Sequence, residues 1–338
     1  MKKRGTGIAC TYFGMGNTAR PNPSSAFIEV CEDGTAIVRC GASELGQGSD
    51  TALGQIAAEA LGITRDRVTM VSDDTASAPD AGVTSASRQT YVSGNAIRLA
   101  AEQARTILLQ EAAEMLDRDP RDFEARDNLF FLKEKPDTCV TIEEMCRRVR
   151  KRGVLVMGTG TYTPPTSEAL DPETGLGIPY GAYSYATQIA EVEVDTETGE
   201  VTVLHVIAAQ DVGKAINPLA VEGQIEGGVA QGVGYALMEE VVVRDGVIQN
   251  PSFSELLIPT ALDVPAIHSI ITEAPEPTGP FGAKGTGEPP ACPTAAAIIN
   301  AIRDAVGVEI TSLPVTAERV YLALKKKREE GGSETGTR

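Results

Sequence analysis

The segment 282–290 contains one carboxylate, Glu288, together with three glycines and a following Pro-Pro pair. Glycine lets a backbone pass close to a bulky ligand, and each proline fixes φ and restricts the residue before it. This pattern predicts a stiff loop that directs a single acid at a ligand. Such a carboxylate, if desolvated, can act as a general base near neutral pH. The alternative interpretation is a surface turn with an exposed Glu288.

Three further loops, 44–48, 84–89 and 223–228, combine small residues with hydroxyl or amide side chains. Small residues and backbone N–H groups suit an anionic, phosphate-bearing ligand. Glutamine can donate and accept hydrogen bonds, which suits a polycyclic, amide-rich ligand or a metal-oxo group. Taken singly, the same loops could be a turn, a helix cap or a close helix-packing face.

Side chains that bind metals directly are not grouped in this sequence. The six cysteines form no C-x-x-C pair, and His205 and His268 lie far apart without a cysteine at ligand spacing. Zinc and iron–sulfur sites are therefore not expected in this chain. The glycines of 227–234 do not follow a strand with G-x-G-x-x-G spacing, so we discount a Rossmann site.

The elements that would carry these loops recur in two halves. In the first half, strands are predicted over 26–30 and 36–40 around an Asp-Gly turn, followed by Gly46-Gln47-Gly48 and a helix over 50–61 that ends at Gly62.

In the second half, strands over 189–194 and 201–208 flank a Thr-Gly turn, and Gly223-Gln224 precedes a helix over 225–240. A Gly-Gln pair between a hairpin and a helix in each half predicts an α+β fold of two similar subdomains whose equivalent loops face one cleft.

Other segments complete the expected organisation. Helices are predicted over 96–117 and 141–151, the second with a capping box and a basic end. We expect a first subdomain over residues 1–157, an extended linker over 158–182, a second subdomain over 183–324 that carries the Glu288 loop, and a flexible tail over 325–338.

Composition narrows the possible partners. The 338 residues are 42% hydrophobic, and the formal net charge of −17 argues against nucleic acid and anionic membranes. No apolar run reaches the roughly 18 residues of a membrane span, and no apolar signal core follows the basic N-terminus. The cysteines are expected to be reduced thiols, which favours a cytoplasmic location.

Taken together, the motifs resemble one family, the molybdenum hydroxylases of the xanthine dehydrogenase and aldehyde oxidase type. The resemblance extends from about residue 5 to residue 322, and several motifs occur in a fixed order. The motifs are residues 46–48, 55–62, 74–75, 85–88, 94–96, 211–213, 216–218, 222–228, Pro259 and 282–290.

The resemblance covers only the C-terminal half of the family's molybdenum-binding subunit, and it implies a second molybdopterin-binding domain. In this respect the chain resembles the split molybdenum-binding subunit of the family's nicotinate dehydrogenase branch. The implied cofactor is a molybdenum–pterin, in the cytosine dinucleotide form, whose metal is held by the pterin dithiolene and by no side chain. The implied partners are a companion chain with the N-terminal half, an iron–sulfur subunit and an FAD subunit.

By position, Glu288 matches the family's general base, which takes a proton from the attacking oxygen. The residues that match cofactor-contacting positions are Gly46, Gln47, Gly48, Thr84, Ser85, Ala86, Ser87 and Gln224.

The implied reaction is hydroxylation of an electron-poor carbon of a small N-heteroaromatic substrate, nicotinate-like or purine-like, with water as the oxygen source. The segment 14–20 lacks the aromatic residue of the purine-oxidising enzymes, which puts purine sandwiching in doubt. Two alternatives stay open. The same scaffold could oxidise an aldehyde or carbon monoxide, or the chain could be a non-catalytic scaffold half.

Overall fold

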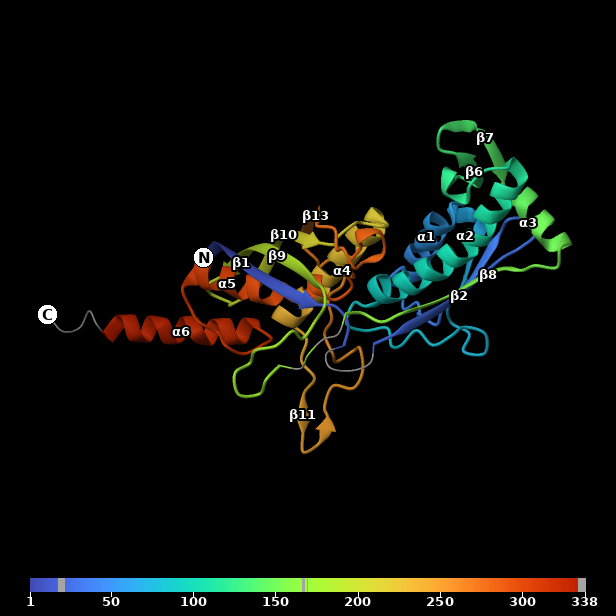
Figure 1. Cartoon of the computed structure of the whole chain (residues 1–338). Helices are drawn as coiled ribbons and strands as arrows, with labels where there is room; N and C mark the ends of the chain where they lie inside the picture. The colour runs from blue at the N-terminus through green and yellow to red at the C-terminus, as the bar shows by residue number, and fades with distance from the viewer. Residues whose placement is uncertain (18–21, 166–167, 169, 334–338) are drawn as a thin grey trace.

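The computed structural model describes residues 1–17, 22–165, 168 and 170–333. Figure 1 shows an elongated arrangement in which two units, each a sheet with helices on one face, lie next to each other. Each unit has its own hydrophobic core of buried side chains. The expected α+β class with two similar subdomains is therefore confirmed.

The first unit is a four-stranded sheet covered by two helices. Its elements are β2 (Ser24–Val30), β3 (Ala36–Arg39), α1 (Ser49–Leu61), β4 (Val68–Val71), α2 (Gly94–Leu116) and β8 (Val156–Tyr162). The strand order is β4-β3-β2-β8, with β3 and β4 parallel and the other pairs antiparallel. Helix α1 connects the parallel pair and ends at Gly62, whose φ of 80° is the left-handed conformation that glycine adopts at helix ends.

The second unit repeats this plan. Its elements are β1 (Lys2–Gly14), β9 (Tyr183–Asp195), β10 (Val201–Asp211), α4 (Pro218–Leu237), β13 (Ala266–Thr272) and α5 (Thr294–Val306). The strand order is β1-β9-β10-β13, with β10 and β13 parallel across α4 and the other pairs antiparallel. Helix α4 therefore corresponds to α1, and α5 corresponds to α2.

In each unit, the strand that packs against the second helix contains a Gly-x-Gly pair: β8 against α2 and β1 against α5. In β8, a Cβ on Gly160 would lie 2.0 Å from the carbonyl oxygen of Ala96 in α2. In β1, a Cβ on Gly7 would lie 2.2 Å from the carbonyl oxygen of Ala297 in α5. Glycine is required at both strands because the helix backbone approaches closer than any side chain allows.

Two predicted boundaries are wrong. The Gly-x-Gly strand of each sheet, β8 in the first unit and β1 in the second, comes from a different place in the chain relative to the rest of its unit. Strand β1 pairs with β9 over its whole length, so residues 2–14 belong to the second unit and not to a first subdomain over 1–157. Strand β8 pairs with β2, so residues 158–162 are not linker. Neither pairing partner is a sequence neighbour, so no local pattern indicates these contacts.

The remaining elements lie at the periphery (Figure 1). They are a sheet of β5 (Phe123–Arg126), β6 (Leu129–Leu132) and β7 (Lys135–Thr141), helix α3 (Ile142–Lys151), a hairpin of β11 (Val243–Arg244) and β12 (Val247–Ile248), and helix α6 (Ala317–Ser333). The expected capping box of α3 is present between Thr141 and Glu144. Among the described residues, no helix has the length and apolar character needed to cross a membrane.

The tail expected over 325–338 is helical as far as Ser333, where the described residues end. Val320 and Leu324 of α6 are buried against the second core. The Lys327 ammonium donates hydrogen bonds to the carbonyl oxygens of Val306 (2.9 Å) and Gly307 (3.0 Å), at the end of α5. These contacts order a charged segment that the composition alone predicts to be frayed.

Candidate active site

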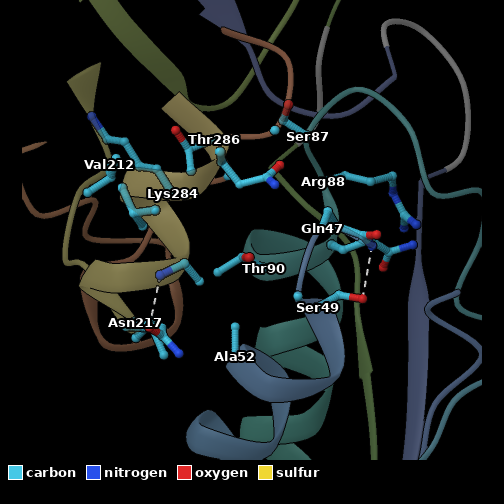
Figure 2. Close-up of a pocket in the computed structure, with 18 of the residues that line it drawn as sticks. Gln47, Ser49, Ala52, Ser87, Arg88, Thr90, Val212, Asn217, Lys284 and Thr286 are labelled. Atoms are coloured by element: carbon cyan, nitrogen blue, oxygen red, sulfur yellow. Dashed lines mark hydrogen bonds between the residues drawn. The ribbon is translucent and has the colours of Figure 1, made fainter. Parts of the chain in front are cut away.

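A cavity of about 360 Å³ lies between the two units. Its walls come from the N-terminal ends of the equivalent helices α1 and α4, from the segment 84–90 and from the segment 284–288. In Figure 2, Gln47, Ser49 and Ala52 lie on one side of this space, with Lys284 and Asn217 on the other. All four loops with candidate chemistry therefore contribute to one cavity, as the repeated plan predicted.

Glu288 lies at the wall of this cavity and is held by the segment 84–88. Its Oε1 accepts a hydrogen bond from the backbone N–H of Ala86 (3.1 Å), and its Oε2 accepts one from the Ser87 hydroxyl (2.7 Å). The backbone N–H of Glu288 donates to the same hydroxyl (3.0 Å). The side chain is exposed to solvent in this chain, yet the two bonds to its oxygens orient the carboxylate, and the third holds its backbone against Ser87.

The residues that hold Glu288 have an unusual backbone. Ala86 and Ser87 have φ values of 53° and 49°, a left-handed conformation that costs roughly 1–2 kcal/mol per residue without glycine. The loop is fixed from both sides. The N–H of Gly16 donates to the Ala86 carbonyl (2.9 Å), and a Cβ on Gly285 would lie only 1.6 Å from the Ser87 carbonyl oxygen. Strained backbone held in this way is typical of functional sites.

Arg88 anchors the other end of this loop, and it also belongs to the cavity lining. Its guanidinium is buried and donates to the carbonyl oxygens of Asn22 (3.1 Å), Pro23 (2.8 Å) and Val83 (3.2 Å), and also to that of Ala81. Burial lowers the pKa of this guanidinium. The side chain therefore connects the loop to the chain before β2, which is a structural role.

A buried ion pair fixes the start of the Glu288 loop to the end of β10. The Lys284 ammonium lies 2.6 Å from Oδ2 of Asp211, and both side chains are more than nine-tenths buried. Asp211 Oδ1 accepts a hydrogen bond from the N–H of Gly213 (2.9 Å). The ammonium also lies 5.8 Å from the centre of the Tyr185 ring. Removing one partner of such a pair leaves a buried charge, at a cost of about 3–5 kcal/mol.

The Gly46-Gln47-Gly48 loop is organised by Glu44, which the sequence analysis missed as a functional residue. Glu44 accepts hydrogen bonds from the N–H groups of Gly46 (2.8 Å) and Gly48 (2.8 Å) through Oε1, and of Asp50 (3.0 Å) through Oε2. Burial would raise the pKa of the Glu44 carboxyl, but these backbone bonds lower it below its usual value. Glu44 therefore caps α1 and occupies two amides that we expected to face a ligand.

Gln47 is likewise held inside its loop. Its Nε2 donates to the Ser43 carbonyl (3.1 Å) and the Ser49 hydroxyl (2.9 Å), and its Oε1 accepts from the N–H of Leu45 (2.5 Å). The side chain lines the cavity, but its polar atoms stabilise the entry into α1.

Gln224 lies inside helix α4, not between a hairpin and a helix as predicted. The helix begins at Pro218, and the Oδ1 of Asn217 accepts a hydrogen bond from the N–H of Ala220 (3.1 Å). Asn-Pro is a strong start signal because Asn caps and Pro suits the first helical position. The glycines at 223, 227 and 228 obscured this start. Gln224 still faces the cavity, and its Oε1 is 3.8 Å from where a Cβ on Gly287 would lie.

Most of the candidate residues meet at this cavity. Those that line it are Gln47, Gly48, Thr84, Ser85, Ser87, Gln224 and Glu288. Gly46 and Ala86 do not line it. They act through their N–H groups, on Glu44 and on Glu288 respectively. Of the segment 14–20, residues 18–20 lie outside the described part of the chain.

The cavity walls fit an anionic group with several hydrogen-bonding atoms. The N-terminal end of α4, with its partial positive charge, faces this space, whereas the N-terminal end of α1 is already capped by the Glu44 carboxylate. The Thr286 hydroxyl lies in the wall, buried, and has no hydrogen-bond partner among the described residues. No group of three or more His, Cys, Asp or Glu residues in the described part of the chain could hold a metal ion.

Comparison with known proteins gives one family. Residues 1–265 match the molybdopterin cofactor-binding domain. The putative xanthine dehydrogenase molybdenum-binding subunit of Escherichia coli is 33% identical over 94% of this chain and 42% of its own length. The aldehyde oxidoreductase of Megalodesulfovibrio gigas is 35% identical over 96% of this chain and 32% of its own length.

The fold agrees with solved structures of such enzymes. Quinoline 2-oxidoreductase from Pseudomonas putida superposes with a TM-score of 0.86 at 29% identity, over 96% of this chain and 42% of that chain. The chain thus spans about two fifths or less of the length of these relatives. The resemblance found in the sequence is confirmed, and the chain belongs to the molybdopterin cofactor-binding domain family.

Proposed function

We propose that this chain is the part of a multi-subunit molybdenum hydroxylase that carries the general base and one side of the cofactor cradle. The substrate is a small N-heteroaromatic compound, hydroxylated at an electron-poor carbon with oxygen from water. The position of Glu288 carries this proposal, because its carboxylate is fixed by Ala86 and Ser87 at the wall of a cavity between two equivalent units. The likeness to quinoline 2-oxidoreductase supports the substrate class.

In this proposal the pterin dinucleotide, in its cytosine form, lies along the cavity. The N-terminal end of α4 and the unpartnered Thr286 hydroxyl receive its anionic and polar groups, with Gln47 and Gln224 at the walls. When bound, the molybdenum–pterin group supplies the oxygen transfer and takes up the electrons of the oxidation. The chain's side chains position this group and do not bind its metal.

Glu288 acts as the general base. Ala86 N–H and the Ser87 hydroxyl each occupy one lone pair of a carboxylate oxygen, so each oxygen keeps another to accept a proton. The carboxylate takes the proton of the water-derived oxygen as that oxygen attacks the substrate carbon. Positioned general bases contribute roughly 10²–10⁴-fold to the rate.

The proposed partners rest on the family, because relatives of this chain are named as subunits of larger complexes. A companion chain equivalent to the rest of the molybdenum-binding subunit completes the cradle, and iron–sulfur and FAD subunits carry the electrons away. The six thiols of this chain are free, which fits a reducing compartment such as the cytoplasm.

A labelling experiment on the complex purified from its native host tests the function. We expect molybdenum in the complex, and one labelled oxygen atom in the product when a heteroaromatic acid such as nicotinate turns over in ¹⁸O-water. The relationship to an aldehyde oxidoreductase makes an aldehyde the comparison substrate. A complex without molybdenum contradicts the proposed enzyme, and turnover of the aldehyde alone contradicts the substrate class.

A further inference from the structure

A segment of the second unit projects from the body of the molecule with its apolar side chains outward. We call residues 239–265, which connect α4 to β13, the arm; the β11–β12 hairpin forms its tip in Figure 1. Its large exposed apolar side chains are Val241 (57% exposed), Val243 (56%), Val247 (60%), Ile248 (50%), Phe253 (82%), Leu257 (63%), Ile258 (47%) and Leu262 (98%). So many exposed large apolar side chains within one segment indicate an interaction site.

The arm is ordered by its own hydrogen bonds. The Asn250 side chain bridges its two strands, accepting from the N–H of Val242 (2.9 Å) and donating to the Glu240 carbonyl (2.7 Å). Further along, the Asp263 carboxylate accepts from the hydroxyl (2.7 Å) and the N–H (2.8 Å) of Thr260. These hydrogen bonds order parts of the arm before it binds a partner, so binding would cost less ordering entropy.

The arm is also anchored to the helix that lines the cavity. At its start, the N–H of Glu239 donates to the Gly234 carbonyl of α4 (2.9 Å). Farther along, the ring of Pro259 comes so close that a Cβ on Gly234 would lie 2.8 Å from its Cδ. A protein that binds the arm is therefore coupled mechanically to α4, whose N-terminal end carries Asn217 and Gln224 at the cavity.

We propose that the arm is the docking surface for the companion polypeptide, the part of the relatives that lies outside their match to this chain. The match covers 42% of the Escherichia coli subunit, so more than half of that protein has no counterpart here. In the relatives, where both parts belong to one polypeptide, the part without a counterpart here is available to cover the apolar arm. This inference rests on the proposed companion chain and extends it by naming the surface on which the companion binds.

A second copy of this chain is the competing occupant, and charge argues against it. Each copy carries a formal net charge of −17, so two copies repel each other at ordinary ionic strength. The companion is expected to present an apolar groove that receives the most exposed side chains of the arm, Phe253, Leu257 and Leu262.

Photo-crosslinking in the assembled protein tests the occupant. A photoreactive amino acid replaces Leu262 in the full chain expressed in its native host, and crosslinked peptides are identified by mass spectrometry. The control position is Leu322 on α6, which is 53% exposed and lies outside the arm. We expect Leu262, but not Leu322, to crosslink to a polypeptide that resembles the part of the relatives missing here. Crosslinks from Leu262 to a second copy of this chain, or equal crosslinking from both positions, would overturn the proposal.

A matched pair of variants measures the contribution of the arm. Phe253→Ser combined with Leu262→Ser should weaken association with the companion by about tenfold or more. A few large anchor side chains supply most of the binding energy of an interface, and both substitutions remove one. Leu322→Ser should leave association unchanged. If the double variant assembles with unchanged affinity into a complex that still hydroxylates substrate, the docking surface is wrong and the proposed function stands. Weakened association of the double variant supports the docking surface, whereas an unchanged complex that lacks molybdenum and activity removes the function whatever the variants do.

Discussion

Glu288 depends on two neighbours whose backbone is itself strained. Ala86 and Ser87 adopt positive φ, and in this conformation they present an N–H and a hydroxyl to the two carboxylate oxygens. Glu288 was predictable because glycine and proline surround it in the sequence. The two partners were expected to contact a cofactor, and their contact with the carboxylate spans about two hundred positions, which no local pattern encodes.

At this scale we predict that Ser87→Ala lowers turnover of the assembled enzyme about tenfold. The substitution removes a charge-assisted hydrogen bond that orients the base, and such bonds are worth about 1.5–3 kcal/mol. Molybdenum content and thermal stability should change little. The control is Ser25→Ala, because the Ser25 hydroxyl lies 3.2 Å from that of Thr161 and neither residue lines the cavity. Equal kcat values for the two variants would show that Ser87 does not position the base.

At the scale of elements, the two units share one plan but take their fourth strand from different parts of the chain. Local signals predicted α1, α3 and the hairpins, because apolar spacing, caps and turn glycines act over a few residues. The pairing of β1 with β9 and of β8 with β2 was missed, because those contacts join distant segments. The glycines of α4 also obscured its start at Pro218.

The Gly-x-Gly strands give a prediction at this scale. Gly7→Ala should lower the free energy of unfolding by about 1–3 kcal/mol, because the new methyl group would lie 2.2 Å from the Ala297 carbonyl oxygen. Gly223→Ala in α4 meets no atom within 4 Å and should stabilise the chain by about 0.4–1 kcal/mol. Urea unfolding of both variants makes the comparison. Equal effects would mean that β1 does not lie against α5 as closely as described.

At the scale of the whole molecule, we propose that this chain supplies one side of a site. Its cavity opens between its own two units, but Glu288 and the arm are exposed in the chain alone. The relatives carry further polypeptide, more than half of their length. The family was predictable because many short motifs occur in a fixed order, whereas the exposed arm became visible only in three dimensions.

We therefore predict that the chain purified alone, correctly folded, contains far less than one molybdenum atom per molecule. In the proposed arrangement a companion chain supplies the other side of the cradle, and obligate interfaces of that kind bury on the order of 2,000 Å². Elemental analysis of the isolated chain and of the chain co-expressed with its companion provides the comparison. Stoichiometric molybdenum in the isolated chain would contradict the division of the site between two chains.

The role of Glu288 as the base is the centre of this account, and the kcat of Glu288→Gln in the metal-loaded complex tests it most directly. Glutamine keeps the shape of the side chain, so assembly and molybdenum content should be nearly intact. The control is Glu309→Gln, a surface carboxylate paired with Arg303 at 2.9 Å. We predict that kcat of Glu288→Gln falls by about 10²-fold or more while the control keeps full activity. Activity of Glu288→Gln within a few-fold of the unchanged enzyme would contradict the assignment.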